Sequence, residues 1–205
     1  MEHKKHILKA FLTHQQWRAL VLLLLIAMVS CKGEAGRRLP DPQALLMKAA
    51  EKGDLALAQK AVTEGADIHA QLGHRADETW TALLLVMSNC HNGQRYVDVA
   101  RFLLDQGADV NVRSGSGTTP LMKAFGNVEM LKLLLEYGAD IQARDHDGMT
   151  AVGYAAQYGQ NDAVMFLIRH GADIHVTTHS GKTLLILAVG LCEPPVIQYL
   201  LDHGL

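Results

Sequence analysis

The chain has 205 residues and a mass of 22.4 kDa, which is enough for one domain with a sizeable core. Apolar residues make up 49% of it, charged residues 20% and aromatic residues 5%. The core therefore has to be built from Leu, Ala, Val and Ile, which favours packed helices over a β-sandwich and excludes a disordered, collagen-like or disulfide-stapled chain. The net charge of −2 and the pI near 6.6 indicate no basic surface, so we expect no nucleic-acid partner.

The first 30 residues have the layout of a secretory signal. A basic stretch that ends at Arg18 is followed by eleven apolar residues, 19–29, and then by a polar run. Eleven helical residues span about 16 Å, half of a hydrocarbon core of about 30 Å, which is short for a stable transmembrane helix. We expect a cleaved signal, with an uncleaved anchor as the alternative. Without residues 1–30 the chain has 15 basic and 20 acidic residues, a net charge of −5.

A cysteine follows the apolar segment directly, in the sequence Met28-Val29-Ser30-Cys31. These residues resemble the lipobox of bacterial lipoproteins, which usually has Leu at the position of Met28. The resemblance implies that Cys31 is lipidated and becomes the first residue of a protein anchored to the membrane and facing the periplasm. Lys32 at the next position implies transport to the outer membrane, and residues 31–43 are then a lipidated tether. An ordinary signal with an incidental cysteine is the alternative, and translation from Met28 would give a cytosolic form.

The remaining residues, 44–205, repeat with a period near 33. Gly-Ala-Asp occurs at 65–67, 107–109, 138–140 and 171–173, and Gly204 lies in the same context. The positions seven, four and three residues before each of these five glycines are all apolar, which is the spacing of one helix face. We expect each glycine to end its helix, because glycine adopts a positive φ without a steric penalty.

Another helix is predicted before that one in every unit. Four of these first helices open on a threonine, a residue that caps helices; the threonines are Thr81, Thr119, Thr150 and Thr183. The first unit is rich in charged residues and resembles a cap, whereas the fifth unit is apolar from Leu184 to Leu191. The outer side of the fifth unit could fray, contact a partner or associate with a second copy, and the sequence does not distinguish these three outcomes.

Two stretches carry a family resemblance. Residues 119–124 read Thr-Pro-Leu-Met-Lys-Ala and residues 133–140 read Leu-Leu-Leu-Glu-Tyr-Gly-Ala-Asp, and residues 150–173 repeat the pattern. They resemble the ankyrin repeat, although no unit has the family's His and only Pro120 keeps its Pro. The resemblance implies an all-α solenoid of about five helix-turn-helix units, residues 44–205, with projecting β-turn fingers. It also implies a protein partner bound by the finger tips and the exposed side of the first helices.

The family's binding positions, carried over onto this chain, define a candidate partner-binding surface. Trp80 occupies a slot that we expect to be exposed and to act as an interface anchor; an indole folded over its own finger is the alternative. The fingers supply Asp77, Glu78, Trp80, His146, Asp147, Met149, His179, Ser180 and Lys182, and the first helices supply Ser88, Asn89, Gln157 and Tyr158.

Two insertions break the repeat, and the third unit is two residues shorter than the others around 125–126. The first finger, from Gly65 to Thr81, is four residues longer than the others, and the second unit has a five-residue insertion between its helices around 88–96. Insertions in solenoids often lie on the binding face, but lengthening a loop costs little free energy. Each insertion is therefore either a binding loop or a change in length that has no effect on function.

No set of residues with the spacing of a catalytic or metal site emerges. Gly181-Lys182-Thr183 fails as a phosphate loop because Val176 stands where a glycine is needed, and no nucleophile-elbow, zincin or Cys-x-x-Cys motif is present. His146 and His179 lie on adjacent fingers, without a third ligand. We expect no enzymatic activity, metal, cofactor or small-molecule substrate.

The sequence is therefore interpreted as a protein-binding lipoprotein of the bacterial envelope. Envelope ankyrin-repeat proteins of this kind resemble immunity proteins, which neutralise interbacterial toxins such as lipases delivered by type VI secretion systems. That resemblance implies a toxin, with a phospholipase favoured, as the partner, and the charge of −5 suits a basic partner surface. A periplasmic scaffold that protects or assists an envelope or oxidative-stress enzyme is the alternative.

Overall fold

A computed structural model of the chain describes residues 41–75, 78–90 and 93–205. The chain divides into two compact units, Met1–Asp41 and Pro42–Leu205, and every residue of the described hydrophobic core belongs to the second. The expected signal segment, Cys31 and most of the tether lie outside the described residues. No helix of the described part is long and apolar enough to span a membrane.

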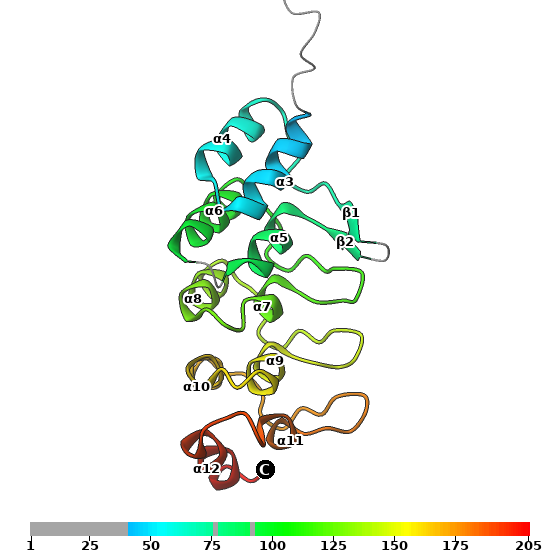
Figure 1. Cartoon of the computed structure of the whole chain (residues 1–205). Coiled ribbons are helices and arrows are strands. Elements are labelled where there is room, and N and C mark those ends of the chain that lie inside the picture. The colour runs from blue at the N-terminus through cyan, green and yellow to red at the C-terminus, as the bar shows by residue number, and fades with distance from the viewer. Residues whose placement is uncertain (1–40, 76–77, 91–92) are drawn as a thin grey trace, which may run out of the picture. The chain divides into compact units, whose positions relative to one another are not determined.

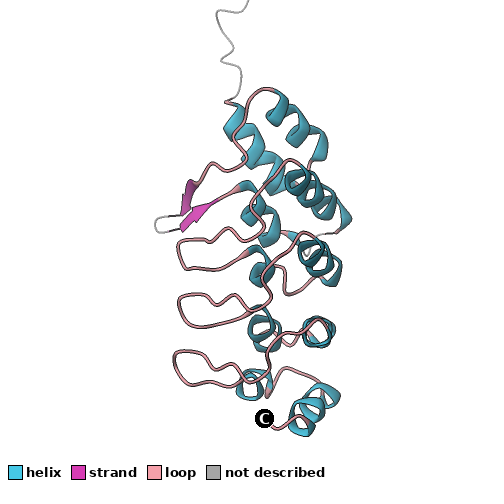
Figure 2. Ribbon diagram, turned by 180° about the vertical axis from the view of Figure 1, so that it is seen from behind, coloured by secondary structure: helices cyan, strands magenta, loops and turns pink. Residues whose placement is uncertain are grey.

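The second unit is a row of five stacked helix pairs, counted over the described residues (Figure 1). The first helices are α3 (Pro42–Lys52), α5 (Ala82–Ser88), α7 (Pro120–Lys123), α9 (Ala151–Gln157) and α11 (Leu184–Ala188). The second helices are α4 (Leu55–Thr63), α6 (Gln94–Asp105), α8 (Val128–Glu136), α10 (Asn161–Arg169) and α12 (Pro194–Asp202). The fingers project from the side of the first helices, away from the second helices (Figure 2). The predicted all-α solenoid of five helix-turn-helix units is confirmed.

Threonine caps start four of the first helices, as predicted. The hydroxyl oxygens of Thr81, Thr119, Thr150 and Thr183 each accept a hydrogen bond from the backbone N–H three residues later, at 3.3 to 3.4 Å. These bonds satisfy a donor that the first turn of a helix otherwise leaves unpaired.

The Gly-Ala-Asp triplets end the second helices and start the fingers. The five glycines after these helices have φ between +83° and +97°, which stops the helix. The aspartate then accepts a hydrogen bond from the backbone N–H two residues later, at 2.9 Å in all four triplets. This Asx turn directs the chain into the finger, so the triplet has a local structural role in every unit.

The core runs the length of the row. The residue four positions before each glycine is fully buried in all five units; these residues are Ala61, Leu103, Leu134, Leu167 and Leu200. In the first unit the buried positions of both helices include several alanines, while Lys48, Glu51 and Lys52 are exposed. The predicted polar character of the first unit is confirmed.

The first finger is a hairpin and differs from the short turns of the other fingers. Strands β1 (Leu72–Arg75) and β2 (Glu78–Trp80) pair antiparallel, with Leu72 opposite Trp80 and Gly73 opposite Thr79. The other three fingers close their turn with a glycine of positive φ two residues before the helix-capping threonine. Thr79 stands at that position here, and a β-branched residue avoids positive φ and favours a strand. The extra residues are therefore used to form a two-stranded ribbon.

The insertion in the second unit is only partly a loop, which corrects the sequence expectation. Helix α6 begins at Gln94 and has 12 residues, whereas each of the other second helices has 9. Tyr96 and Val97 in its added turn are buried, and the Tyr96 hydroxyl donates a hydrogen bond to the backbone oxygen of Glu51 at 3.0 Å. The added turn is helical because it buries apolar surface against the first unit.

Candidate functional site

The tips of the second, third and fourth fingers are tied together by hydrogen bonds. The His146 N–H donates to the oxygen of Ser116 at 3.1 Å, and the His179 N–H donates to the oxygen of Asp147 at 2.9 Å. The Arg113 guanidinium donates to the oxygen of Arg144 at 2.8 Å, and Arg144 in turn donates to Thr177. These three fingers therefore form one continuous edge.

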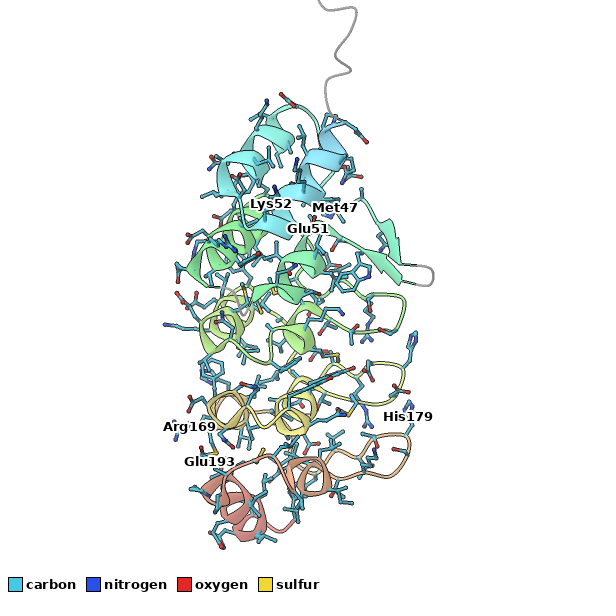
Figure 3. The ribbon with its side chains drawn as sticks, in the orientation of Figure 1. Met47, Glu51, Lys52, Arg169, His179 and Glu193 are labelled. Carbon is cyan, nitrogen blue, oxygen red and sulfur yellow. The ribbon has the colours of Figure 1, made fainter. Side chains whose placement is uncertain are left out.

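The two finger histidines lie over the preceding finger. A Cβ atom on Gly117 would lie 2.7 Å from the imidazole of His146, and one on Gly148 would lie 2.9 Å from that of His179. Nδ1 of His179 is 2.9 Å from the oxygen of His146, which accepts the bond. Figure 3 shows His179 on the finger side of the row, opposite Arg169 and Glu193 on the side of the second helices.

Most of the predicted finger residues are solvent-exposed in the structure. They are His146, Asp147, His179, Ser180 and Lys182. Asp77 lies outside the described residues, and Glu78 is described only as part of the backbone of β2. The tips thus offer a mixed set of imidazole, carboxylate, hydroxyl and ammonium groups.

The prediction that the slot before each capping threonine is exposed is wrong in the interior units. Met149 has an exposed fraction of 8% and Thr118 of 6%, so Met149 is not a surface residue. The Cε atom of Met149 would lie 3.5 Å from a Cβ on Gly153, so this side chain fills the space that Gly153 leaves. Lys182 is exposed because no described unit packs beyond the fifth.

Trp80, in the same slot, is half-buried and is held by the third unit. The Nζ atom of Lys123, the last residue of α7, lies 4.2 Å from the centroid of the indole ring. A cation at this distance is attracted by the face of the ring. Lys123 was not among the predicted residues, because the contact joins segments 43 residues apart.

An aromatic stack lies at the carboxyl ends of α7 and α9. Tyr158 has an exposed fraction of 54%, and its ring is stacked on that of Phe125, with centroids 4.7 Å apart and planes inclined by 12°. Phe125 is also parallel to Tyr154 at 6.2 Å, and the Tyr154 hydroxyl donates to the buried Asp145 carboxylate at 2.6 Å. Phe125 could have been found from the sequence. The third unit is two residues shorter than the fourth, and counting back from the glycines Gly138 and Gly171 places Phe125 at the position of Tyr158.

The other predicted helix residues lie at the carboxyl ends of α5 and α9. Ser88 is exposed and Asn89 half-buried, and their side chains donate to the backbone oxygens of Leu84 and Leu85 at 3.1 and 3.0 Å. Gln157 is exposed beside Tyr158. We define the inner face as these helix ends together with the finger tips. Met149 is buried and therefore does not belong to this face.

The described residues were compared with the requirements of a metal site and of a reactive thiol. Among them no group of three or more His, Cys, Asp or Glu is placed to hold a metal ion. Burial raises the pKa of the Cys90 thiol to about 11 and also raises the pKa of Cys192. Catalytic cysteines have a lowered pKa, so neither thiol has the property of a nucleophile.

A row of stacked helix pairs, with fingers joined by hydrogen bonds and an exposed tyrosine ring beside them, is the architecture of a repeat protein with an extended binding surface. The family described as ankyrin repeats, in three copies, matches residues 46–145 and 142–205. The chain therefore belongs to the ankyrin-repeat family, and its repeats form a protein–protein interaction domain. No curated protein matches the chain.

Proposed function

We propose that this protein is a non-enzymatic lipoprotein of the bacterial envelope that binds and neutralises an interbacterial toxin, such as a type VI secretion lipase. The proposal joins the protein-binding repeats to the resemblance of residues 28–31 to a lipobox. Lipidation of Cys31 would hold the repeats in the periplasm, at the outer membrane, where they would meet a delivered toxin.

The stack of Tyr158 on Phe125 is the observation that supports the inner face as the binding site. Aromatic rings that are exposed yet already held lose little conformational entropy when a partner covers them. Tyr and Trp are also the side chains that most often carry binding energy at interfaces. Trp80, held by Lys123, adds a second ring on the same side of the row.

A co-purification experiment tests the proposal. The full chain, with an affinity tag inserted in residues 33–40, is expressed in its own host, and the bound proteins are identified by mass spectrometry. We expect a toxin in stoichiometric amount with the unmodified protein and at least about tenfold less with Tyr158→Ala. Tyr199→Ala, on α12 of the opposite layer, is the matched control and should retain the partner.

Two further outcomes decide against the proposal. Recovery of an envelope or oxidative-stress enzyme would replace the immunity role by that of a periplasmic scaffold. Cells that lack the gene should be killed by toxin-delivering siblings, so survival equal to that of the parent strain would reject the immunity role. A Cys31→Ser variant should lose its membrane attachment if Cys31 is lipidated.

A further inference from the structure

The backbone N–H of the aspartate in Gly-Ala-Asp donates to a side-chain amide in three of the four triplets. The accepting oxygens belong to Gln43, Asn111 and Gln142, and the donating groups to Asp67, Asp140 and Asp173, at 2.9, 2.8 and 3.1 Å respectively. Asp109 differs, because within the described ranges its N–H has no hydrogen-bond acceptor. The second triplet therefore has an unpaired backbone donor at a place where the other triplets bind an amide.

The glycine of the same triplet supplies an acceptor beside this donor. The amide of Asn111 also donates to the Gly138 oxygen at 3.2 Å, and the amide of Gln142 donates to the Gly171 oxygen at 2.7 Å. Each of these amides thus binds the acceptor and the donor of one triplet together. A carboxamide is the group that this part of the repeat recognises within the chain itself.

In the second triplet the matching pair is the Gly107 oxygen and the Asp109 N–H. His69 stands at the position of Asn111 and Gln142, and an imidazole cannot bind both groups because its ring nitrogens point in different directions. No side chain in the described part of the chain bonds to either member of the pair. The pair therefore keeps its capacity to bind an amide.

A cavity of about 130 Å³ lies beside this pair, between the first and second fingers. Its lining includes His69, Asp109 and Thr81, the residue that caps α5. The equivalent space in the fourth unit, where the amide is present, is lined by Thr150 and Asp173 and measures about 10 Å³, which holds one water molecule at most. The first junction therefore has both the polar pair and room for a side chain.

A side-chain carboxamide matches both groups, because it carries a donor nitrogen and an acceptor oxygen on one carbon. A carboxylate has no donor for the Gly107 oxygen and is repelled by the carboxylate of Asp109. An ammonium group has no acceptor for the Asp109 N–H. The N–H and C=O of a trans peptide group point in opposite directions, so the backbone of a partner cannot make both bonds.

We propose that the Gly107 oxygen and the Asp109 N–H, with the cavity beside them, form an amide site that binds an asparagine or glutamine side chain of a protein partner. Thr81 lines the cavity and directly follows Trp80, so a partner segment at the indole also lies near the amide site. The bound amide joins the first two units from outside, as the chain's own amides join the later units from within. This inference rests on the proposed function, in that the partner is a protein, and it names a chemical group that the partner presents.

Nuclear magnetic resonance of the isotope-labelled compact unit 42–205, which contains every residue of the described core, tests the proposal. The probe is N-acetylglutamine methylamide, and its glutamate analogue is the matched control. We expect the glutamine probe to shift the Asp109 amide resonance saturably, with a dissociation constant on the order of 10 mM. The glutamate analogue should shift it at least about fivefold less at the same concentration, because a carboxylate lacks the donor.

Two substitutions of His69 complete the test. His69→Asn supplies the amide from within the chain and should abolish the response to the glutamine probe, whereas His69→Ala should retain it. Equal shifts with both probes, a response that survives in His69→Asn, or no saturable shift of the Asp109 resonance at up to about 100 mM would each overturn the proposal.

The same variants separate this inference from the proposed function. In the co-purification, His69→Asn should lower the recovery of the partner at least about tenfold and His69→Ala should not, so full recovery with His69→Asn would also overturn the amide site. Failure of the glutamine probe rejects the amide site whatever protein is recovered. Absence of a toxin from the co-purification, with an intact response to the probe, rejects the proposed function alone.

Discussion

At the scale of single residues, Asp145 organises the third finger and the aromatic stack beside it. Its buried carboxylate accepts hydrogen bonds from the backbone N–H groups of Asp147 and Met149, at 2.9 and 2.8 Å, and from the Tyr154 hydroxyl at 2.6 Å. Ser114 and Thr178 occupy this position in the neighbouring fingers. The carboxylate thus fixes the ring of Tyr154, against which Phe125 lies.

Tyr154 should make the protein sensitive to alkaline pH. Burial, followed by the hydrogen bond to Asp145, raises the pKa of Tyr154 above its usual value of 10. The folded state therefore favours the neutral phenol, and this contribution to stability is complete below pH 10 and is lost as the pH rises above it. We expect the free energy of unfolding, from urea titrations at pH 7 to 11, to fall more steeply above about pH 10 in the wild type than in Tyr154→Phe. Tyr158→Phe is the control, and equal slopes in wild type and Tyr154→Phe would contradict the assignment.

The two described cysteines should differ in reactivity. Cys90 is fully buried and its pKa is raised to about 11, whereas Cys192 is half-buried. An accessible thiolate attacks the disulfide of Ellman's reagent, so at pH 8 the native unit 42–205 should react at Cys192 before Cys90. Cys192→Ser should abolish the fast phase and Cys90→Ser should retain it. Simultaneous reaction of both thiols in the native protein would show that Cys90 is not enclosed.

At the scale of the elements, successive units are clamped by one amide side chain at a fixed position, two residues after the aspartate of Gly-Ala-Asp. Asn111 donates to the oxygen of Gly138 at 3.2 Å and accepts from the Asp140 N–H at 2.8 Å. Gln142 makes the matching pair, to Gly171 at 2.7 Å and from Asp173 at 3.1 Å. A side-chain amide can form both bonds because it carries a donor and an acceptor side by side.

The first junction lacks this clamp. His69 occupies the position there, and among the described residues its imidazole makes no hydrogen bond to the second unit. The two ring nitrogens point in different directions, so an imidazole cannot replace the amide. The hydrogen bond from Tyr96 to Glu51 joins these two units instead, which gives the inserted helical turn a structural function.

The contribution of each amide clamp to the free energy of unfolding can be measured separately. Asn111→Ala and Gln142→Ala should each lower the free energy of unfolding by about 1 to 2 kcal/mol, because each removes two hydrogen bonds that join neighbouring units. His69→Ala is the matched control at the same position and should change it by less than about 0.5 kcal/mol. Urea unfolding followed by circular dichroism provides the values. Equal losses in all three variants would remove the special role of the amides.

At the scale of the whole compact unit, stability is shared between neighbouring units. Each unit buries its apolar faces only against the next, so a repeat array opens from its weakest junction. Charged residues are exposed in the first unit, whereas Ile186, Val189 and Leu201 are exposed in the fifth, so the two ends of the row have different surfaces.

Hydrogen exchange should reveal the weak first junction. We expect the backbone amides of α3 and α4 to exchange at least about tenfold faster than those of α8, because the first unit can open without the rest. His69→Asn, which restores an amide at the clamp position, should slow exchange in the first unit alone. Hydrogen–deuterium exchange with mass spectrometry measures both effects. Identical exchange rates in α3, α4 and α8 would mean that the array opens as one cooperative unit.

The sequence by itself determined the elements and their order. Threonine caps and glycines of positive φ act within a few residues, and the apolar positions have the spacing of a helix face, so all of them can be read without knowing the neighbouring units. The family followed from the same residues. Most of the inner-face candidates followed as well, because they lie at equivalent positions of the repeat.

Only the tertiary structure decided which of these positions reach the surface and what they contact. Met149 is buried because Gly153 leaves space beside it, Lys123 covers Trp80 from another unit, and the shortened third unit places Phe125 under Tyr158. The hairpin of the first finger likewise required the pairing of β1 with β2. The contacts of Trp80 with Lys123 and of Phe125 with Tyr158 join different units, and their distances depend on how units of unequal length stack, which no local pattern in the sequence specifies.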